Sequence, residues 1–155
     1  MAMEDLDSLL AEEELLQFTT FSNEDALALG AVLVEAARAA ALPVTIDIRR
    51  GDQQLFHAAM PGTTADNDAW IERKIRVVRR FGRSSFAVGT ALRLDGRTIE
   101  DTYLLSESEY APHGGAFPVT VKDVGVVGTV AVSGLPQEED HAFVVGVLRE
   151  FLRVK

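Results

Sequence analysis

Apolar residues recur at the three- and four-residue spacing of an amphipathic helix in four stretches of the chain. Ser22 followed by Asp25 is typical of a helix start, and Pro43, Gly82 and Pro136 stand where helices end or begin. The pattern predicts helices over Glu4–Gln17, Ala26–Leu42, Ala69–Phe81 and from Pro136 to Arg153.

Other stretches alternate apolar and polar residues with the two-residue period of a strand. Gly51 and Asp52 supply a turn between two of them, so we expect a β-hairpin there, and a second, valine-rich hairpin follows later. Gly62–Asn67 is rich in turn residues and is expected to be a loop. The predicted strands are Val44–Arg49, Leu55–Ala59, Phe86–Leu94, Val119–Val121 and Val124–Val132, with Thr98–Leu105 as a further candidate for the sheet.

Short turns join most neighbouring strands, so the sheet should be largely antiparallel. The sequence therefore predicts an α+β fold, in which a five-stranded sheet lies between helices on both faces as an α-β-α sandwich. A length of 155 residues suits one domain. We expect residues 1–21 to form an acidic helical segment and residues 22–155 to form the domain.

Charge and composition narrow the choice of partners. Twenty-four acidic and fifteen basic residues give a net charge of −9, which repels nucleic-acid phosphates and anionic lipids. The absence of cysteine excludes disulfides, thiol nucleophiles and Cys-ligated metal centres. No stretch approaches the apolar length of a membrane span, and the acidic N-terminus is unlike a signal peptide. We therefore expect a cytoplasmic protein that binds neither nucleic acid nor membranes.

The first candidate site is the loop His113-Gly114-Gly115-Ala116-Phe117-Pro118. Paired glycines allow a close backbone approach, and an imidazole beside them can ligate a metal or transfer protons near neutral pH. The alternative is a loop that needs glycine only for its turn, with His113 merely exposed. The sequence leaves these two interpretations evenly balanced.

The second candidate is the segment Ser133-Gly134, which leads from a strand into the helix that carries Asp140 and His141. A helix N-terminus presents free N–H groups to anions, but three acids in the first turns oppose that role. Both Asp140 and His141 fall on the inner face, where each must find a partner. Because adjacent helix residues do not face each other, each is expected to pair with a different group. A structural hydrogen-bond network is favoured here over a catalytic one.

The third candidate is the segment Asp66-Asn67-Asp68-Ala69-Trp70-Ile71-Glu72-Arg73-Lys74, which leads into the helix over Ala69–Phe81. Lys74 falls among its apolar residues, where either snorkelling to solvent or a ligand would explain a lysine. The opposite face is expected to be solvated charge rather than a docking site for an acidic partner. Its residues are Arg73, Arg76, Arg79 and Arg80.

Several common motifs are missing from the sequence. It contains no phosphate-binding loop, dinucleotide fingerprint or hydrolase nucleophile elbow. Its three histidines form no His-x-x-x-His pair and there is no cysteine, so no metal site is expected.

Four blocks of the sequence resemble an uncharacterised protein family of the haem-degrading-domain superfamily, which also includes GlcG-like proteins, HbpS-like proteins and the C-terminal domain of PduO-type proteins. The superfamily signature is a Gly-Gly-x-Pro loop, a strand ending in Val-Ser-Gly, and an Asp in the last helix. Here Gly114, Gly115 and Pro118 match the loop, with one extra residue between the glycines and the proline. Residues 132–134 match Val-Ser-Gly, and Asp140 matches the Asp of the last helix. The blocks are 65–74, 80–85, 113–118 and 132–141, and they occur in this order between residues 22 and 153.

The resemblance implies a profilin-like fold and assembly into homo-oligomers, as dimers or larger rings. It also implies binding of haem or a related tetrapyrrole in some members, with slow haem breakdown in parts of the superfamily. The residues that would hold a haem are His113 or His57 as axial ligand, Trp70 and Phe117 as apolar walls, and Lys74 or Arg73 near the propionates.

Three functions are therefore open. The first is a small-ligand-binding oligomer. The second is an enzyme acting on a small anionic or tetrapyrrole substrate, with His113 or His141 as acid–base and Lys74 or Arg73 holding a carboxylate. The third is a non-catalytic scaffold, whose arginine-bearing helix and acidic N-terminal segment contact other proteins. The expected ligand site comprises Trp70, Arg73, Lys74, His113, Gly114, Gly115, Phe117, Ser133, Gly134, Asp140 and His141.

Overall fold

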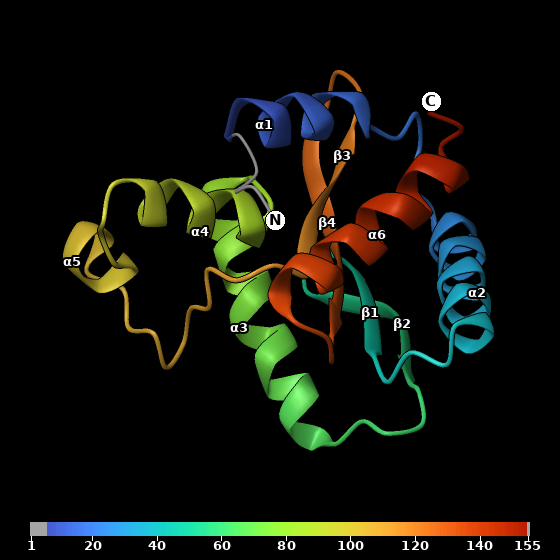
Figure 1. Ribbon diagram of the computed structural model, residues 1–155. Helices are drawn as coiled ribbons and strands as arrows, with labels where there is room; N and C mark the ends of the chain where they lie inside the picture. Colours follow the sequence, from blue (N-terminus) through green and yellow to red (C-terminus); the bar gives the residue numbers. More distant parts are fainter. Residues whose placement is uncertain (1–5, 155) are drawn as a thin grey trace.

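Two β-hairpins build the sheet of this protein, whose computed structural model describes residues 6–154 (Figure 1). β1 (Thr45–Arg50) and β2 (Gln53–Ala59) form the first hairpin, around the predicted turn at Gly51. β3 (Ala116–Val121) and β4 (Gly125–Ser133) form the second. Because β1 also pairs with β4, the strand order is β2-β1-β4-β3 and every pair is antiparallel.

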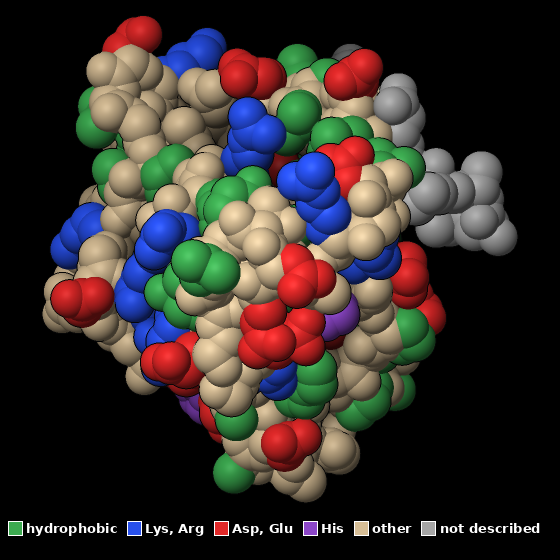
Figure 2. Space-filling view, turned by 90° about the vertical axis from the view of Figure 1, so that its left-hand side faces the viewer, with side chains coloured by type: hydrophobic (Ala, Val, Ile, Leu, Met, Phe, Trp, Pro, Cys, Tyr) green, Lys and Arg blue, Asp and Glu red, His purple; other side chains and the backbone are tan. Residues whose placement is uncertain are grey.

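Helices cover both faces of this sheet, as the sequence predicts (Figure 1). α3 (Ala65–Phe81) packs on one face, and α2 (Asn23–Ala39) and α6 (Gln137–Phe151) pack on the other. α4 (Ser85–Leu94) packs against α3, α6 and β3, and α5 (Ile99–Tyr103) follows it at one end of the molecule. Acidic and basic side chains are interspersed over the face at this end (Figure 2).

The two faces of the sheet differ in chemistry. Successive strand residues point to opposite faces, so Ile46 and Ile48 of β1 enter the main hydrophobic core with α2 and α6, while Asp47 points toward α3. Ala116 and Ala131 form a small separate cluster with three apolar residues of α3. The α3 face of the sheet is therefore built from small and polar side chains, which leaves room for polar groups beneath that helix.

The sheet has four strands, so the prediction of five strands was wrong. Phe86–Leu94 lies in the helix α4, whose N-cap Ser84 accepts a hydrogen bond from the Ala87 N–H at 3.1 Å. Most of Thr98–Leu105 belongs to the short helix α5 and not to the sheet. Six consecutive residues at the start of α4 are buried, and a helix buried on all sides lacks the periodicity that separates it from a strand.

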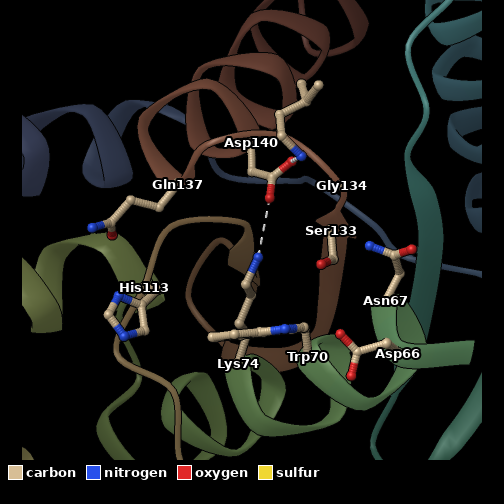
Figure 3. Close-up of a pocket in the computed structure, with 10 residues that line it drawn as sticks. Asp66, Asn67, Trp70, Lys74, His113, Ser133, Gly134, Gln137 and Asp140 are labelled. Carbon is tan, nitrogen blue, oxygen red and sulfur yellow. Dashed lines mark hydrogen bonds and ion pairs between the residues drawn. The ribbon is translucent and has the colours of Figure 1, made fainter. Parts of the chain in front are cut away.

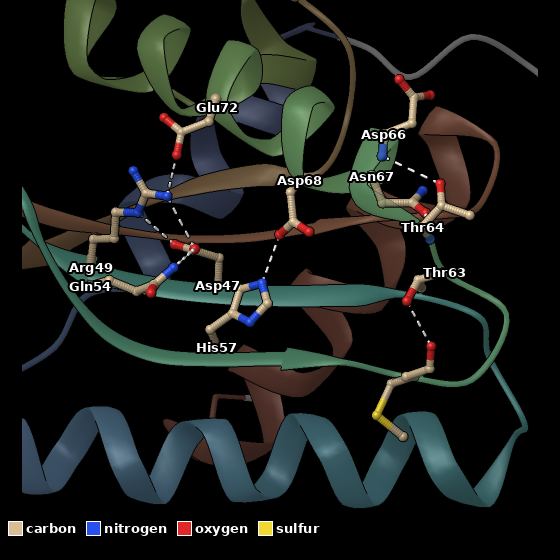
Figure 4. Close-up of polar contacts among 11 residues, drawn as sticks. Asp47, Arg49, Gln54, His57, Thr63, Thr64, Asp66, Asn67, Asp68 and Glu72 are labelled. Atoms are coloured by element: carbon tan, nitrogen blue, oxygen red, sulfur yellow. Dashed lines mark hydrogen bonds and ion pairs between the residues drawn. The ribbon is translucent and has the colours of Figure 1, made fainter.

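Helix ends agree with the predicted capping signals, with one exception. Ser22 and Asp25 form the expected capping box, and Gly82 ends α3 in the left-handed conformation, with φ +68°. The exception is Gly62–Asn67, where α3 already begins at Ala65 because Thr64 and Asn67 form a second capping box (Figure 4).

The N-terminal segment packs onto the rest of the chain. α1 (Leu6–Leu15) carries Leu9 into a cluster with Phe86 and Ala87 of α4. The Phe18 N–H then donates to Thr120 O at 2.7 Å, so this residue pairs with the free edge of β3. Glu4 and Asp5 of the predicted first helix lie outside the described residues. No helix within 6–154 is long and apolar enough to cross a membrane.

Candidate functional site

A cavity of about 320 Å³ opens between the first half of α3, the end of β4 and the start of α6 (Figure 3). The loop before β3 contributes one side of it. Helix and strand ends meet here, which is a common location for binding sites. The lining residues are Asp66, Asn67, Trp70, Lys74, His113, Ser133, Gly134, Leu135, Gln137 and Asp140.

A buried ion pair forms the inner end of the cavity. Lys74 Nζ lies 3.1 Å from Asp140 Oδ2 and donates a second hydrogen bond to Val132 O at 3.3 Å. The other Asp140 oxygen accepts the Leu135 N–H at 3.0 Å. The two side chains are only 4% and 2% exposed, so the pair is shielded from bulk water and joins α3 to α6.

Burial moves the protonation equilibria of both partners toward their neutral forms. Desolvation lowers the pKa of Lys74, and the Asp140 charge opposes this shift. Desolvation likewise raises the pKa of Asp140, and here the charge of Lys74 is the largest opposing influence. Burial therefore narrows the difference between the two pKa values relative to water.

His113 stands at the side of the cavity with its ring 5.9 Å from the Trp70 ring, edge to face. Burial lowers the pKa of His113, and the positive charges of Arg93 and Lys74 lower it further. The imidazole is therefore neutral near pH 7 and can accept a proton or a hydrogen bond, or ligate a metal.

The glycine pair beside His113 has a clear packing role. Gly114 packs so closely on α6 that a Cβ would overlap Gln137 O, and its N–H donates to Gln137 Oε1 at 3.0 Å. Gly115 has φ +139°, and a Cβ there would overlap Val132 O. Both glycines allow the loop to lie against β4 and α6, and neither lines the cavity.

Arg73 contacts the outer side of Trp70 rather than the cavity. Its guanidinium carbon lies 4.4 Å from the centre of the Trp70 ring, a cation–π contact. Its Nε donates to Glu107 O at 3.0 Å. Arg76 and Arg79 also hydrogen-bond to backbone carbonyls, of Glu109 and Gly51. Arg76, Arg79 and Arg80 are exposed, as predicted for a solvated face, and Arg73, Arg76 and Arg79 also hold neighbouring loops against α3.

Three other candidates lie away from the cavity. Phe117 is in the main core, with its ring 6.1 Å from His141. His141 stacks on Phe86 at 4.7 Å, and its Nε2 lies 3.8 Å from Glu12 Oε1, too far for a hydrogen bond. His57 is on β2, where its Nε2 pairs with Asp68 Oδ1 at 2.7 Å (Figure 4). The expectation that adjacent Asp140 and His141 face different partners is confirmed.

A polar network fixes the position of α3 above the sheet (Figure 4). Buried Asp47 accepts hydrogen bonds from Arg49 Nε at 2.8 Å and Gln54 Nε2 at 2.6 Å. Arg49 also donates to Glu72 of α3, two residues after Trp70. Burial opposes ionisation of Arg49, but the hydrogen bonds that Arg49 donates to Glu72 and Asp47 outweigh it and raise the pKa of Arg49. This network therefore helps to place Trp70 and Lys74 at the cavity.

Four cavity residues were not in the list of expected ligand-site residues: Asp66, Asn67, Leu135 and Gln137. Two of them lie in the first turn of α3, which the sequence analysis placed in a loop. The capping pair Thr64 and Asn67 was the signal that could have found this turn. No three His, Asp or Glu side chains within the described range 6–154 are grouped as a metal site.

Comparison with known proteins supports the resemblance inferred from the sequence. The family model described as Haem degrading protein HbpS-like matches residues 21–149. A UPF0303 protein of Streptomyces avermitilis is 56% identical over 147 residues, covering 95% of this chain and 90% of that protein.

Solved structures share the fold. The crystal structure of the Ybr137w protein is 34% identical with a TM-score of 0.90, covering 96% of this chain and 88% of that one. HbpS is 20% identical with a TM-score of 0.66, covering 88% and 92% of the two chains. The PduOC:Heme complex is 17% identical with a TM-score of 0.68, covering 83% and 93%. The predicted combination of antiparallel sheet and helices is thereby confirmed.

Proposed function

Because the chain belongs to the HbpS-like haem-degrading family, we propose that it is a small-ligand-binding protein and that the cavity between α3 and α6 is its binding site. The observation that carries this proposal is a fully buried ion pair at the inner end of a cavity lined by further polar side chains. Buried charges are costly, and perturbed ionisable groups in a cavity are typical of functional sites. The expected site residues gathered there are Trp70, Lys74, His113, Ser133, Gly134 and Asp140.

The lining favours a small polar ligand. Ser133 offers a hydroxyl, Asn67 and Gln137 offer amides, and His113 offers a neutral imidazole. Trp70 supplies one flat apolar wall. A volume of about 320 Å³ is at the lower end of the usual range for ligand cavities, roughly 300–1,000 Å³.

The interior of the cavity does not suit a haem. A tetrapyrrole needs extended apolar walls, whereas acidic and amide side chains form much of this lining. Phe117 lies in the main core, and His57 lies on β2, so two of the residues expected to hold a haem are elsewhere.

Haem binding at the mouth of the cavity is a second candidate. One solved structure with this fold is a haem complex, and half-buried His113 offers a neutral imidazole beside Trp70 and Arg73. In that arrangement His113 would hold the iron, and Arg73 would lie nearest the propionates.

The fluorescence of Trp70, the single tryptophan of the chain, tests the first proposal. We would titrate the protein with small hydroxy acids, oxo acids, hydroxyketones, polyols and amino acids, one compound at a time. At least one compound should give a saturable change in fluorescence. Ser133→Ala should weaken the affinity for that compound by about three- to tenfold, the range expected for one hydrogen bond. His57→Ala, outside the cavity, should leave the affinity unchanged. If every compound fails, or both variants behave like wild type, the proposed site is wrong.

A haemin titration followed by visible absorption tests the second candidate. Binding through His113 requires a saturable shift of the Soret band that His113→Ala abolishes and His57→Ala retains. A non-saturating response in all three proteins would eliminate haem and leave the small-ligand proposal intact.

A further inference from the structure

Lys74 is placed unlike the other described lysine of the chain. The sequence contains Lys74, Lys122 and Lys155. Lys122 lies in the exposed turn between β3 and β4, whereas Lys74 is 3% exposed and lines the cavity. A lysine in this position is reached only by a molecule small enough to enter the cavity.

The hydrogen bonds of Lys74 leave its amine able to react. Nζ has three proton positions, and two are directed at Val132 O and Asp140 Oδ2. One position therefore has no protein acceptor among these contacts, and the side chain rises from α3 toward Asp140 within the cavity (Figure 3). Gly115 contributes to this geometry because a Cβ there would crowd Nζ.

Asp140 stands where a proton acceptor for this amine is needed. Its Oδ2 lies 3.1 Å from Nζ, and its other oxygen is held by the Leu135 N–H. Burial lowers the pKa of Lys74 and raises the pKa of Asp140, which makes transfer of a proton from the ammonium to the carboxylate less costly than it is in water. Desolvation of a lysine in a closed site is a known route to a nucleophilic amine.

We propose that Lys74 condenses reversibly with the carbonyl group of a small ketone or aldehyde bound in the cavity, forming an imine. The inference rests on the proposed ligand site and names its ligand class as small carbonyl compounds.

Each step balances without an oxidant or a reductant. The ammonium of Lys74 first gives one proton to Asp140. The free amine then attacks the carbonyl carbon, so a C–N bond forms and the carbonyl oxygen receives the proton that the nitrogen loses. The C–O bond then breaks, and the hydroxyl leaves as water with the second proton that the nitrogen loses, which leaves the C=N bond. The proton held by Asp140 can return to the imine nitrogen.

The alternative is that Lys74 and Asp140 form a purely structural ion pair. The two roles differ in one measurable respect, because only an imine can be fixed to the protein by mild reduction. The small number of lysines makes the labelled position easy to identify by mass spectrometry of peptides.

The experiment incubates the full chain with sodium cyanoborohydride and either pyruvate or hydroxyacetone. These two ketones have similar size and differ in carrying a carboxylate or a hydroxymethyl group. We expect saturable labelling of Lys74 by at least one of them, about tenfold faster than labelling of Lys122. The preferred probe then shows whether the cavity favours an acid or a neutral hydroxyketone. Labelling of Lys74 no faster than that of Lys122 with both probes would overturn the proposal.

Two variants separate reactivity from folding. Lys74→Arg keeps a cation beside Asp140 but cannot form an imine. Position 74 of this variant should therefore stay unlabelled, and only the slow labelling of Lys122 should remain. Asp140→Asn removes the proton acceptor, so it should slow labelling of Lys74 by about tenfold. Because Lys74 and Lys122 are compared within the wild-type chain, the test is decisive even if a variant fails to fold.

Trp70 fluorescence, measured with the same probes without reductant, distinguishes this proposal from the proposed function. A saturable fluorescence change without an adduct on Lys74 would overturn imine formation and retain the ligand site. Absence of both would overturn imine formation, and the wider fluorescence titration would then decide on the ligand site.

Discussion

A lysine on the apolar side of a helix is stable only if another element supplies its counter-charge. Lys74 of α3 finds it in Asp140 of α6, a residue 66 positions further along the chain. The sequence placed each of them on an inner face, but nothing local to either residue indicated that they meet. The pair forms because α3 and α6 approach the same end of β4 from opposite faces of the sheet.

Removing one partner of the ion pair should destabilise the protein much more than removing both. Asp140→Asn leaves a buried lysine without a counter-charge, and we expect it to lower the free energy of unfolding by about 3–5 kcal/mol. Combining it with Lys74→Met should restore a large part of this loss, because no charge is then buried. Urea denaturation of the four proteins of the double-mutant cycle measures this coupling. Simple additivity of the two losses would contradict the description of the pair as buried and mutually dependent.

The lowered pKa of His113 gives the molecule a defined response to acid. The folded state holds a proton at His113 less tightly than the unfolded chain does, since burial disfavours the imidazolium. The contribution of His113 to stability is therefore present above its ordinary pKa of 6.5 and is lost as the pH falls through the lower pKa of the folded state. Thermal unfolding below pH 6.5 should show a shallower loss of stability for His113→Gln than for wild type. If stability falls equally steeply with pH in both proteins, His113 is protonated as readily in the folded state as in the unfolded chain.

Elements whose local signals agree with their environment were predicted well. The β1–β2 hairpin has alternating residues and a two-residue turn, and α2 has a capping box at Ser22. α4 was mistaken for a strand because nearly every residue of its first two turns is buried, so its sequence has no polar face. Its start depends on Ser84, whose hydroxyl also donates a hydrogen bond to the Glu13 carboxylate of α1. That contact between distant segments could not be read from the sequence.

The candidate site was predicted only in part, because local patterns locate the elements but not every contact between them. Trp70, Ser133 and Asp140 lie near helix or strand ends that the sequence located. Lys74 lies in the middle of α3, and the cavity brings all four together. His141 and Phe117 were chosen with them because they adjoin the right segments, yet their side chains point to the other side of α6 and into the main core. The direction in which a side chain points from its helix or strand depends on packing that only the folded chain determines.

Two glycines in the middle of helices should respond oppositely to the same substitution. Gly89 of α4 lies against the loop before β3, and a Cβ there would overlap Pro112 O, so Gly89→Ala should lower the free energy of unfolding by about 1–3 kcal/mol. Gly146 of α6 faces open space, so Gly146→Ala should raise it by about 0.5–1 kcal/mol through helix propensity alone. Denaturant unfolding of both variants gives the comparison. Stabilisation by Gly89→Ala would show that the loop does not need this close approach.

At the scale of the whole molecule, α3 supports both the site and its surroundings. Its inner side carries Lys74, and its outer arginines hold the loop before β3 and the β1–β2 turn. The division of the chain at residue 21, the cytoplasmic location and the homo-oligomeric state stay predictions.

Assembly into a homo-oligomer has a candidate surface at the α4–α5 end. Leu94, Tyr103 and Leu104 are exposed there, Leu104 by 88%, and burying exposed apolar side chains between two chains favours association. Size-exclusion chromatography with light scattering should give a mass of at least two chains, and Leu104→Glu should lower it, while Val124→Glu on the β3–β4 turn should not. A monomeric wild-type protein would contradict the prediction.

The central claim is the location of the ligand site, and nuclear magnetic resonance of the 15N-labelled chain tests it most directly. Compounds that change Trp70 fluorescence should shift the indole N–H resonance of Trp70 and the backbone amides of Ser133 and Gln137. Resonances of Ala58 and Met60, which line a separate apolar cavity beside α2, should stay in place. Shifts confined to Ala58 and Met60, or no shift at the Trp70 indole, would contradict the claim that ligands bind between α3 and α6.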